Sequence, residues 1–465
     1  MKVVSKKSVL AGHITVPGSK SHTIRALLLA GIANGTSHIY NPLESNDCVS
    51  TVEALKLLGC DISFTDDSPS QNPNEGKNKT VWTVKGTGNN FTLPTEPINV
   101  GNSGSLMYFL SPILSTKSGE VTFTGDESIC KRPVDHLVDA FSQLDVEAKC
   151  LENNACPPFS FKGPLNINKK LVTDGALSQY ISGFMMAASQ MNGTFEMELE
   201  NPKETPYLTM TQRWLNNLGC DVQISKDFKK ITVTGPTEIE GFDKTIPSDW
   251  EGVAFPLIAC LMGGSGSEIV IDNIDVSGTQ GDSKIVEILQ SVGANIVIDK
   301  NNKSLRVYGN KRLSTKGLPK KTLKINVSEY PDAICALAVI ACYIEGKTVI
   351  TDIDICRKKE TDRVSAMAKI LSELGADIKD EGDQLVILGH NQYNEDGTLN
   401  TKCRLHGGKV DCYKDHRIAM SLACFGLGLK NSEAVEIKDG ECCSVSFPHF
   451  FEEMNKLGAG FAISE

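Results

Sequence analysis

The sequence predicts an α/β protein of two similar domains, each containing three copies of a small βαβ-type module. Three observations support this prediction. The chain has 465 residues, which is too long for one ordinary core and favours at least two domains. A helix-exit motif and a turn-and-strand motif both recur along its whole length. The copies are roughly 75–85 residues apart, a spacing too long for a solenoid unit.

The helix-exit motif is Leu-Gly followed by Cys or Ala and then Asp, at the end of a helix-like segment. Glycine suits this position because it adopts the left-handed conformation in which the last carbonyls of a helix find partners. The second copy is weaker and has Asp145 in place of the glycine. The copies occupy residues 58–61, 144–147, 218–221, 292–295, 374–377 and 457–459.

The turn-and-strand motif is a short turn followed by alternating strand residues. Its copies begin at Asn34, Ser118, Asn192, Ser265, Glu345 and Asn431. Six copies of both motifs at near-regular spacing predict six modules, three on each side of a division near Pro247-Ser248-Asp249.

The overall charge excludes some classes of partner. The chain has 47 Lys and Arg against 57 Asp and Glu, a net charge of −10. Non-specific binding to nucleic acid or a membrane surface is therefore disfavoured, and any anion site must come from a few converging cations. The longest apolar run, residues 334–344, is too short to cross a bilayer, and the N-terminus shows no signal peptide. We expect a soluble cytoplasmic protein whose fifteen cysteines are reduced, structural thiols.

The first candidate anion site is the segment Pro17–Arg25. It follows a short strand and opens an apolar-periodic segment, residues 24–32, which predicts a helix. Free N–H groups at a helix start bind phosphate or carboxylate. Ser21 and Arg25 share a helix face, with Lys20 at the same end. The alternative is an ordinary capped helix with solvated charges. The segment is not a Walker loop, because that glycine and lysine spacing is absent.

Two shorter segments are weaker candidates. In Val100–Ser105, two glycines flank small polar residues before an apolar run, so backbone N–H groups could approach a ligand there. A plain turn explains the pattern equally well. Lys131-Arg132-Pro133 is a basic pair of the kind that usually lies on the surface.

Residues 357–363, with the sequence RKKETDR, are more informative. On a helix, Lys359 and Arg363 would lie one turn apart with Glu360 between them. Such an arrangement clamps an anion and keeps a carboxylate for proton transfer, although a salt-bridged helix face would look the same. Asp332 stands just before the apolar run, and Arg417 follows His416, which we expect to support packing. No metal-binding spacing of His, Cys or acidic residues is present, so no metal is expected.

Together these segments resemble one family. The motifs GSKSHTIR, GNSGS, KRP, LSQY, PY, YPDA, RKKETDR, DHR and SFPHFF occur in the order seen in the 5-enolpyruvylshikimate-3-phosphate synthase (EPSP synthase) family, across essentially the whole chain. The resemblance implies an inside-out α/β barrel in each of two domains, each of three βαβαββ units, with a substrate cleft between the domains. It also implies that the N-terminal strand crosses over, so we expect domains of residues 19–247 and of residues 1–18 plus 248–465.

The resemblance implies transfer of the enolpyruvyl group of phosphoenolpyruvate to the 5-hydroxyl of shikimate 3-phosphate, with release of phosphate, in aromatic amino acid biosynthesis. Protonation of the methylene carbon lets the hydroxyl attack C2, and the tetrahedral adduct then loses phosphate. No cofactor is implied, the partners are two anionic small molecules, and a monomer is expected. Gly104 leaves space beside phosphoenolpyruvate. The sequence is therefore compatible with inhibition by glyphosate but does not decide it.

Site residues are also implied by the resemblance. Asp332 is the expected base at the hydroxyl, Glu360 the partner proton carrier, and Lys20 a contact of both substrates. The implied shikimate 3-phosphate contacts are Lys20, Ser21, Arg25, Ser178, Gln179, Tyr207, Asp332 and Lys359. The implied phosphoenolpyruvate contacts are Lys20, Gly104, Arg132, Gln179, Arg363 and Arg417.

Four positions depart from the family pattern. Leu177 and Glu204 stand where serines are common, Tyr108 where Arg is usual, and Val445 where some members have Lys. Each lost charge-assisted hydrogen bond costs about 1.5–3 kcal/mol, although Thr205 could replace the second serine if its loop shifts by one residue. The departures affect the expected identity of the acceptor more than the expected binding of phosphoenolpyruvate, whose arginines are all present.

Other functions therefore stay open. One is an enolpyruvyl transferase with a different phosphorylated acceptor, and another is a non-catalytic anion-binding protein. The related UDP-N-acetylglucosamine enolpyruvyl transferases are disfavoured. They carry Asn where Ser21 stands, and their loop cysteine lies farther from the Arg than Cys130 lies from Arg132.

Overall fold

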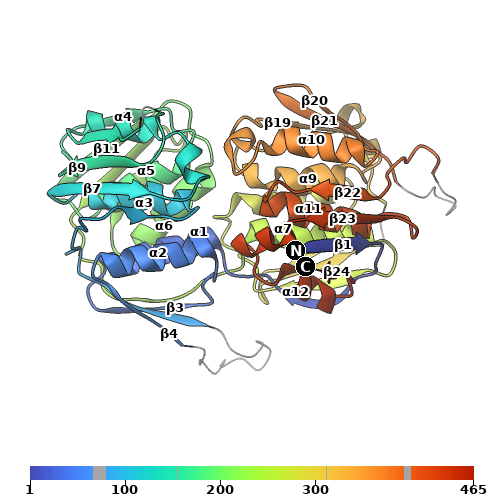
Figure 1. Cartoon of the computed structure of the whole chain (residues 1–465), viewed down its shortest axis with the longest axis horizontal. Helices are drawn as coiled ribbons and strands as arrows, with labels where there is room; N and C mark the ends of the chain where they lie inside the picture. Colours follow the sequence, from blue (N-terminus) through green and yellow to red (C-terminus); the bar gives the residue numbers. More distant parts are fainter. Residues whose placement is uncertain (66–79, 153, 310–311, 392–399, 465) are drawn as a thin grey trace. The chain divides into compact units, whose positions relative to one another are not determined.

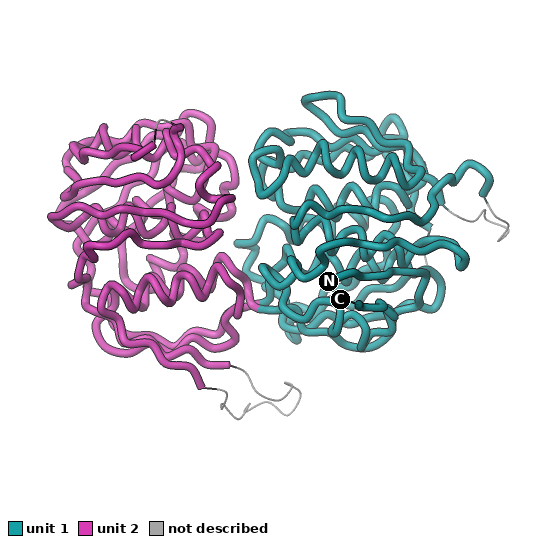
Figure 2. Tube along the Cα trace, viewed as in Figure 1, with its two compact units in different colours: residues 1–17, 248–465 teal, residues 18–247 magenta. Residues whose placement is uncertain are grey.

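A computed structural model describes residues 1–464 except 66–79, 153, 310–311 and 392–399 (Figure 1). The α/β class predicted from the sequence is confirmed. By its internal contacts the chain divides into two compact units (Figure 2). Unit 1 comprises Met1–Pro17 and Ser248–Glu465, and unit 2 comprises Gly18–Pro247.

Unit 2 contains three four-stranded sheets with strand orders β14-β3-β5-β4, β6-β7-β9-β8 and β10-β11-β13-β12. In each sheet the first strand is parallel to the second, and the remaining neighbours are antiparallel. The strands are β3 (Thr36–Tyr40), β4 (Asp61–Thr65), β5 (Val81–Lys85), β6 (Ile98–Asn99), β7 (Gly119–Thr124), β8 (Glu147–Cys150), β9 (Phe159–Gly163), β10 (Leu171–Thr173), β11 (Gly193–Leu199), β12 (Asp221–Ile224), β13 (Lys230–Gly235) and β14 (Asp243–Thr245).

Unit 1 repeats the same sheet three times, with orders β2-β15-β17-β16, β18-β19-β21-β20 and β22-β23-β1-β24. The N-terminal strands complete two of these sheets, because β1 lies between β23 and β24 and β2 pairs with β15. The strands are β1 (Lys2–Lys6), β2 (Ala11–Thr15), β15 (Glu268–Asp272), β16 (Asn295–Asp299), β17 (Ser304–Tyr308), β18 (Thr322–Asn326), β19 (Gly346–Thr351), β20 (Asp377–Asp380), β21 (Gln384–Gly389), β22 (Gly408–Asp411), β23 (Ala434–Lys438) and β24 (Ala462–Ser464).

Each module contributes one central helix and one outer helix. The central helices are α1 (Lys20–Ile32), α3 (Gly104–Leu114), α5 (Ser178–Ala188), α7 (Trp250–Gly263), α9 (Ile334–Ala341) and α11 (His416–Leu427). They are almost entirely buried, and each unit has its own apolar core around them. The outer helices have an exposed face and are α2 (Asn46–Leu57), α4 (Asp135–Gln143), α6 (Thr205–Asn217), α8 (Lys284–Ser291), α10 (Arg363–Glu373) and α12 (Phe450–Lys456). With the strands they form the predicted βαβαββ modules.

Both repeated motifs have the predicted structure. The glycines of the helix-exit motif all have positive φ, between 84° and 101°, at Gly59, Gly219, Gly293, Gly375 and Gly458. In the weaker second copy, Asp145 takes the same left-handed conformation with φ 62°. The strands of the turn-and-strand motif are β3, β7, β11, β15, β19 and β23.

The predicted helix across residues 357–363 is wrong. A 3-10 helix spans Ile355–Lys358, Lys359 is extended with ψ −156°, and α10 begins only at Arg363. The reason is Asp362, whose side chain accepts from the backbone N–H of Ser365 and caps α10. In contrast, α1 begins at Lys20, four residues before the apolar pattern on which the prediction rested.

Among the described residues, no helix is long and apolar enough to cross a membrane, and no cluster of His, Cys, Asp and Glu has the geometry of a metal site. The fifteen cysteines are free thiols, as predicted, and most are buried.

Candidate functional site

The starts of the central helices carry most of the predicted site residues. Lys20 and Ser21 begin α1, Gly104 begins α3, and Ser178 begins α5. In unit 1, Asp332 lies in a 3-10 turn, Pro331–Ala333, that runs directly into α9, and Arg417 is the second residue of α11. Hydrogen bonds join one helix start to another within each unit, so the repeated module gathers side chains that are far apart in the sequence.

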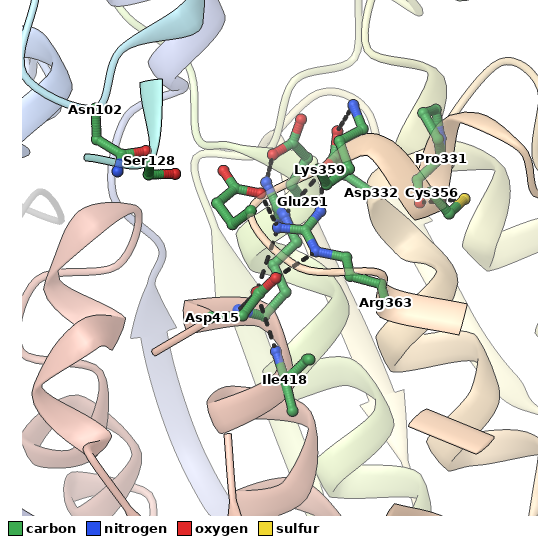
Figure 3. Close-up of polar contacts among 12 residues, drawn as sticks. Asn102, Ser128, Glu251, Pro331, Asp332, Cys356, Lys359, Arg363, Asp415 and Ile418 are labelled. Carbon is green, nitrogen blue, oxygen red and sulfur yellow. Dashed lines mark hydrogen bonds and ion pairs between the residues drawn. The ribbon is translucent and has the colours of Figure 1, made fainter. Parts of the chain in front are cut away.

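In unit 1, Asp332 is surrounded by three cations. Its Oδ1 lies 2.5 Å from Arg363 Nη1 and 3.3 Å from Arg417 Nε, and its Oδ2 lies 3.2 Å from Lys359 Nζ (Figure 3). Burial raises the pKa of the Cys356 thiol to about 12, and that neutral thiol donates to the Pro331 carbonyl in the turn that carries Asp332. Asp332 is therefore a partly buried carboxylate in a cationic setting.

Arg363 is the centre of this cluster and has a side chain that is 0% exposed. Besides Asp332 it bonds Glu360, with Nη2 2.6 Å from Oε2, and Asp415, with Nε 2.8 Å from Oδ2. Burial alone lowers the pKa of Arg363, but the charges of Asp415, Glu360 and Asp332 outweigh it and raise the pKa well above the ordinary value. Arg363 is a permanent cation that holds three carboxylates.

Asp415 connects this cluster to the backbone. Its Oδ1 accepts from the N–H of Arg417 at 2.9 Å and of Ile418 at 3.4 Å, which caps α11. Because Asp415 binds Arg363 and caps α11 at once, it fixes the position of Arg417 relative to Arg363.

Glu251 is a site residue that the sequence analysis missed. It is the second residue of α7, and its Oε2 forms an ion pair with Arg417 Nη2. The missed signal was the repeat itself. The five other central helices have predicted site residues at or just before their starts, so the start of α7 was the place to search. We call Glu251, Asp332, Lys359, Glu360, Arg363, Asp415 and Arg417 the Asp332 cluster.

In unit 2, Lys20 at the start of α1 forms an ion pair with Asp47 in the first turn of α2, 3.3 Å between Nζ and Oδ2. Asp47 is a second residue that the sequence analysis did not single out. Both side chains are largely buried, so Lys20 is held in place rather than solvated.

Arg25 lies one turn further along α1 and is only 1% exposed. Its donors reach Thr211 Oγ1 at 2.8 Å, the Ser21 carbonyl at 2.9 Å and the Tyr207 carbonyl at 3.3 Å, and its guanidinium lies over the Phe109 ring. Burial lowers the pKa of Arg25 to about 9. Since these partners are neutral, and no described residue forms an ion pair with Arg25, the guanidinium brings a buried positive charge to this part of unit 2.

Arg132 lies over the start of α3. Its Nη2 donates to Asn102 Oδ1 at 2.7 Å and to Ser128 Oγ at 3.1 Å. A Cβ added to Gly104 would lie 3.4 Å from Arg132 Nη1, so glycine leaves room beside the guanidinium. These contacts bring the GNSGS and KRP segments together.

The start of α5 makes contacts in two directions. Gln179 Nε2 donates to Ser105 Oγ at 3.0 Å, which joins α5 to the GNSGS segment. Ser178 donates to Glu204 Oε2 from its N–H at 3.2 Å and from its Oγ at 3.0 Å. Glu204 is the residue before α6, so the carboxylate bridges the starts of α5 and α6.

The other departures from the family pattern remove polar groups. Tyr108 is buried in α3, where burial raises its pKa, and its hydroxyl donates to the Pro133 carbonyl. Leu177 precedes α5 without a side-chain cap, and Val445 ends a 3-10 helix, Gly440–Val445. Tyr108 and Val445 therefore do not supply the positive charge that Arg or Lys has at these positions, and Leu177 does not supply the hydroxyl of a serine.

The structure thus brings the predicted residues together within each unit. Unit 1 supplies Asp332, Lys359, Glu360, Arg363 and Arg417, and unit 2 supplies Lys20, Ser21, Arg25, Gly104, Arg132, Ser178, Gln179 and Tyr207. Their contacts with substrates remain predictions.

Comparison with known proteins covers the whole chain. Residues 4–454 match the family model described as EPSP synthase (3-phosphoshikimate 1-carboxyvinyltransferase). A 3-phosphoshikimate 1-carboxyvinyltransferase of Acetivibrio thermocellus is 33% identical, with 99% of each chain covered. The protein of the same name from Methanocaldococcus jannaschii is 32% identical, again with 99% of each covered.

Solved structures agree with the sequence relatives. An EPSP synthase structure from Acinetobacter baumannii superposes with a TM-score of 0.80 and 26% identity, covering 100% of this chain and 99% of that one. The fold, the order of the motifs and the helix-start residues all point the same way: the chain belongs to the EPSP synthase family of 3-phosphoshikimate 1-carboxyvinyltransferases.

Proposed function

We propose that this transferase moves the enolpyruvyl group of phosphoenolpyruvate to the 5-hydroxyl of shikimate 3-phosphate through the residues described above. The observation that carries the proposal is the setting of Asp332, a carboxylate contacted by Lys359, Arg363 and Arg417. A site that only bound two anions would gain nothing from a carboxylate among its cations. A site that must also move a proton needs one.

The reaction requires one proton to leave the acceptor hydroxyl and one to reach the methylene carbon of phosphoenolpyruvate. We assign the first step to Asp332, as the base, and the second to Glu360, as the proton carrier, with Lys20 contacting both substrates. The hydroxyl oxygen bonds to C2 to give a tetrahedral adduct. One methyl proton of the adduct then leaves as the C–O bond to phosphate breaks, which re-forms the carbon–carbon double bond, so atoms balance without a cofactor. Neighbouring cations offset the charge that develops on the phosphate.

The family resemblance divides the expected substrate contacts into two sets. Following the family motifs, we assign phosphoenolpyruvate to Arg132, Arg363 and Arg417, together with Lys20, Gly104 and Gln179. The acceptor is assigned to Lys20, Ser21, Arg25, Ser178, Gln179, Tyr207, Asp332 and Lys359. These residues come from both units, so the proposal requires both sets to act on one substrate pair. We further propose that the enzyme works as a cytoplasmic monomer, in line with the expectation from the family resemblance.

The test is phosphate release by the purified protein with shikimate 3-phosphate and phosphoenolpyruvate, each omitted in turn. We expect release only when both are present, and the organic product should gain the enolpyruvyl group by mass spectrometry. Release with another phosphorylated acceptor, but not with shikimate 3-phosphate, would refute the acceptor assignment. Binding of either substrate without turnover would refute the proposal that the protein is a catalyst.

A further inference from the structure

Glu204 has a place in unit 2 that the proposed reaction does not explain. It precedes α6 in a left-handed conformation, with φ 51°, and its side chain is almost fully buried, at 5% exposure. Both donors that Ser178 offers, its backbone N–H and its hydroxyl, point to the same oxygen, Oε2. The carboxylate therefore occupies the position at the start of α5 where an anion is most favoured.

The electrostatics of this position are those of an anion site. The N-terminus of a helix carries partial positive charge and free N–H groups, which bind phosphate and carboxylate alike. Arg25 adds a guanidinium whose hydrogen-bond partners, Thr211, Ser182 and the carbonyls of Ser21 and Tyr207, are all neutral. Ser182 belongs to α5 and Tyr207 to α6, so Arg25 contacts the same two helices that Glu204 bridges.

A phosphate and a carboxylate cannot both use Ser178 at close range. Two like charges in a low-dielectric setting repel strongly, and a hydroxyl that already donates to Oε2 cannot donate elsewhere with the same hydrogen. Ser178 is one of the residues that we assign to the acceptor. The acceptor's anionic group and Glu204 therefore compete for one donor pair.

We propose that Glu204 sets the affinity for the acceptor by acting as a resident anion at the start of α5. In the structure described here its carboxylate holds Ser178. When the anionic group of the acceptor arrives, Glu204 must turn away from Ser178. The inference rests on the proposed function, since it takes the acceptor to be phosphorylated and to contact Ser178.

A purely structural role is the competing explanation. Glu204 bridges α5 and α6, so its carboxylate could simply stabilise that junction. The two roles predict different effects of removing the Glu204 charge on acceptor binding. Under the resident-anion proposal, removing the charge improves acceptor binding, whereas under a structural role the change lowers stability and leaves acceptor binding unchanged or weaker.

The decisive variant is Glu204→Gln, which keeps the shape and a hydrogen-bond acceptor but removes the charge. We expect the KM for shikimate 3-phosphate to fall about tenfold, as loss of one charge repulsion would produce, with the KM for phosphoenolpyruvate within about twofold of wild type. Glu204→Ser should act in the same direction. Glu200→Gln, at an exposed position four residues earlier, is the matched control and should change neither KM.

An unchanged or raised KM for shikimate 3-phosphate in Glu204→Gln would overturn the proposal, whether or not the melting temperature falls. Failure of the proposed function would show separately, as an inactive wild-type protein. Calorimetric titration with inorganic phosphate would then still test Glu204. Tighter phosphate binding by Glu204→Gln than by wild type would support the resident-anion role, and equal binding would refute it.

Discussion

The two units are built from the same module, yet the buried arginines near their helix starts have different kinds of partner. In unit 1 the cations are already paired: Arg363 holds three carboxylates and Arg417 holds Glu251. In unit 2 the buried cation Arg25 has neutral hydrogen-bond partners, and the nearby carboxylate of Glu204 bonds Ser178 instead. A repeated scaffold therefore carries two kinds of site.

The difference matches two different tasks. A network of alternating charges keeps titratable carboxylates beside permanent cations, which suits proton transfer. A buried cation among hydroxyls and carbonyls keeps positive charge available, which suits recognition of an anionic acceptor. Five tests, in order of decreasing expected effect, would break or sharpen this comparison.

Arg363→Met removes the centre of the Asp332 cluster. Asp415 is fully buried, and with Glu360 and Asp332 it would be left with like-charged neighbours. We expect the free energy of unfolding to fall by about 3–5 kcal/mol in urea titrations, because a buried carboxylate loses its counter-ion. Arg306→Met, which breaks the exposed pair with Glu268, is the control and should leave the unfolding curve unchanged. A small effect for Arg363 would mean that the network is not structural.

Asp332→Ala tests the assignment of proton transfer to unit 1. We expect kcat to fall by a factor of about 100 or more while the fold is kept, since loss of a general base typically costs that much. Circular dichroism checks the fold, and Asp354→Ala, at an exposed position just before the 3-10 helix Ile355–Lys358, is the control. Near-normal turnover would remove Asp332 from the mechanism.

Arg25→Ala tests the assignment of acceptor recognition to unit 2. The change removes the buried positive charge and the anchor of the Ser21 and Tyr207 carbonyls. The KM for shikimate 3-phosphate should rise about tenfold, with little change in the KM for phosphoenolpyruvate. Arg213→Ala, at an exposed position of α6, is the control. A change confined to phosphoenolpyruvate would reverse the two substrate assignments.

Gly59→Ala in unit 2 and Gly293→Ala in unit 1 compare the scaffolds instead of the sites. Both glycines end outer helices with φ near 100°, and an added Cβ has its nearest neighbour beyond 3.5 Å in both cases. The cost should therefore come from backbone strain alone, about 1 kcal/mol in each unit, with kcat unchanged. Clearly unequal losses in thermal unfolding would show that the modules are not equivalent scaffolds.

Glu251→Gln removes the carboxylate that sequence analysis missed. The Nε atom of Arg417 would keep its contact with Asp332, but Nη2 would lose its ion pair with Glu251. The KM for phosphoenolpyruvate should rise about threefold, as expected when a nearly buried arginine loses one of two contacts and keeps the other, with the acceptor KM unchanged. Glu373→Gln, at an exposed position at the end of α10, serves as the reference. Tighter phosphoenolpyruvate binding would instead make Glu251 a competitor of the substrate.

Most of the scaffold could be predicted because its signals are local. A glycine at a helix exit and an alternating strand after a turn depend on the backbone of a few neighbouring residues, and both motifs had the expected structure in every module. The candidate site was only partly predictable. The family motifs located the residues, but they did not indicate that Asp362 interrupts the expected helix and leaves Lys359 extended.

The sequence by itself determined the six modules, and with the family motifs it located the residues at or just before the starts of five central helices. Only the tertiary structure decided which charges meet. Glu251 and Arg417 are 166 positions apart, and Arg25 and Thr211 are 186 apart. No local pattern pairs such residues, because their proximity depends on how one buried helix packs against the next.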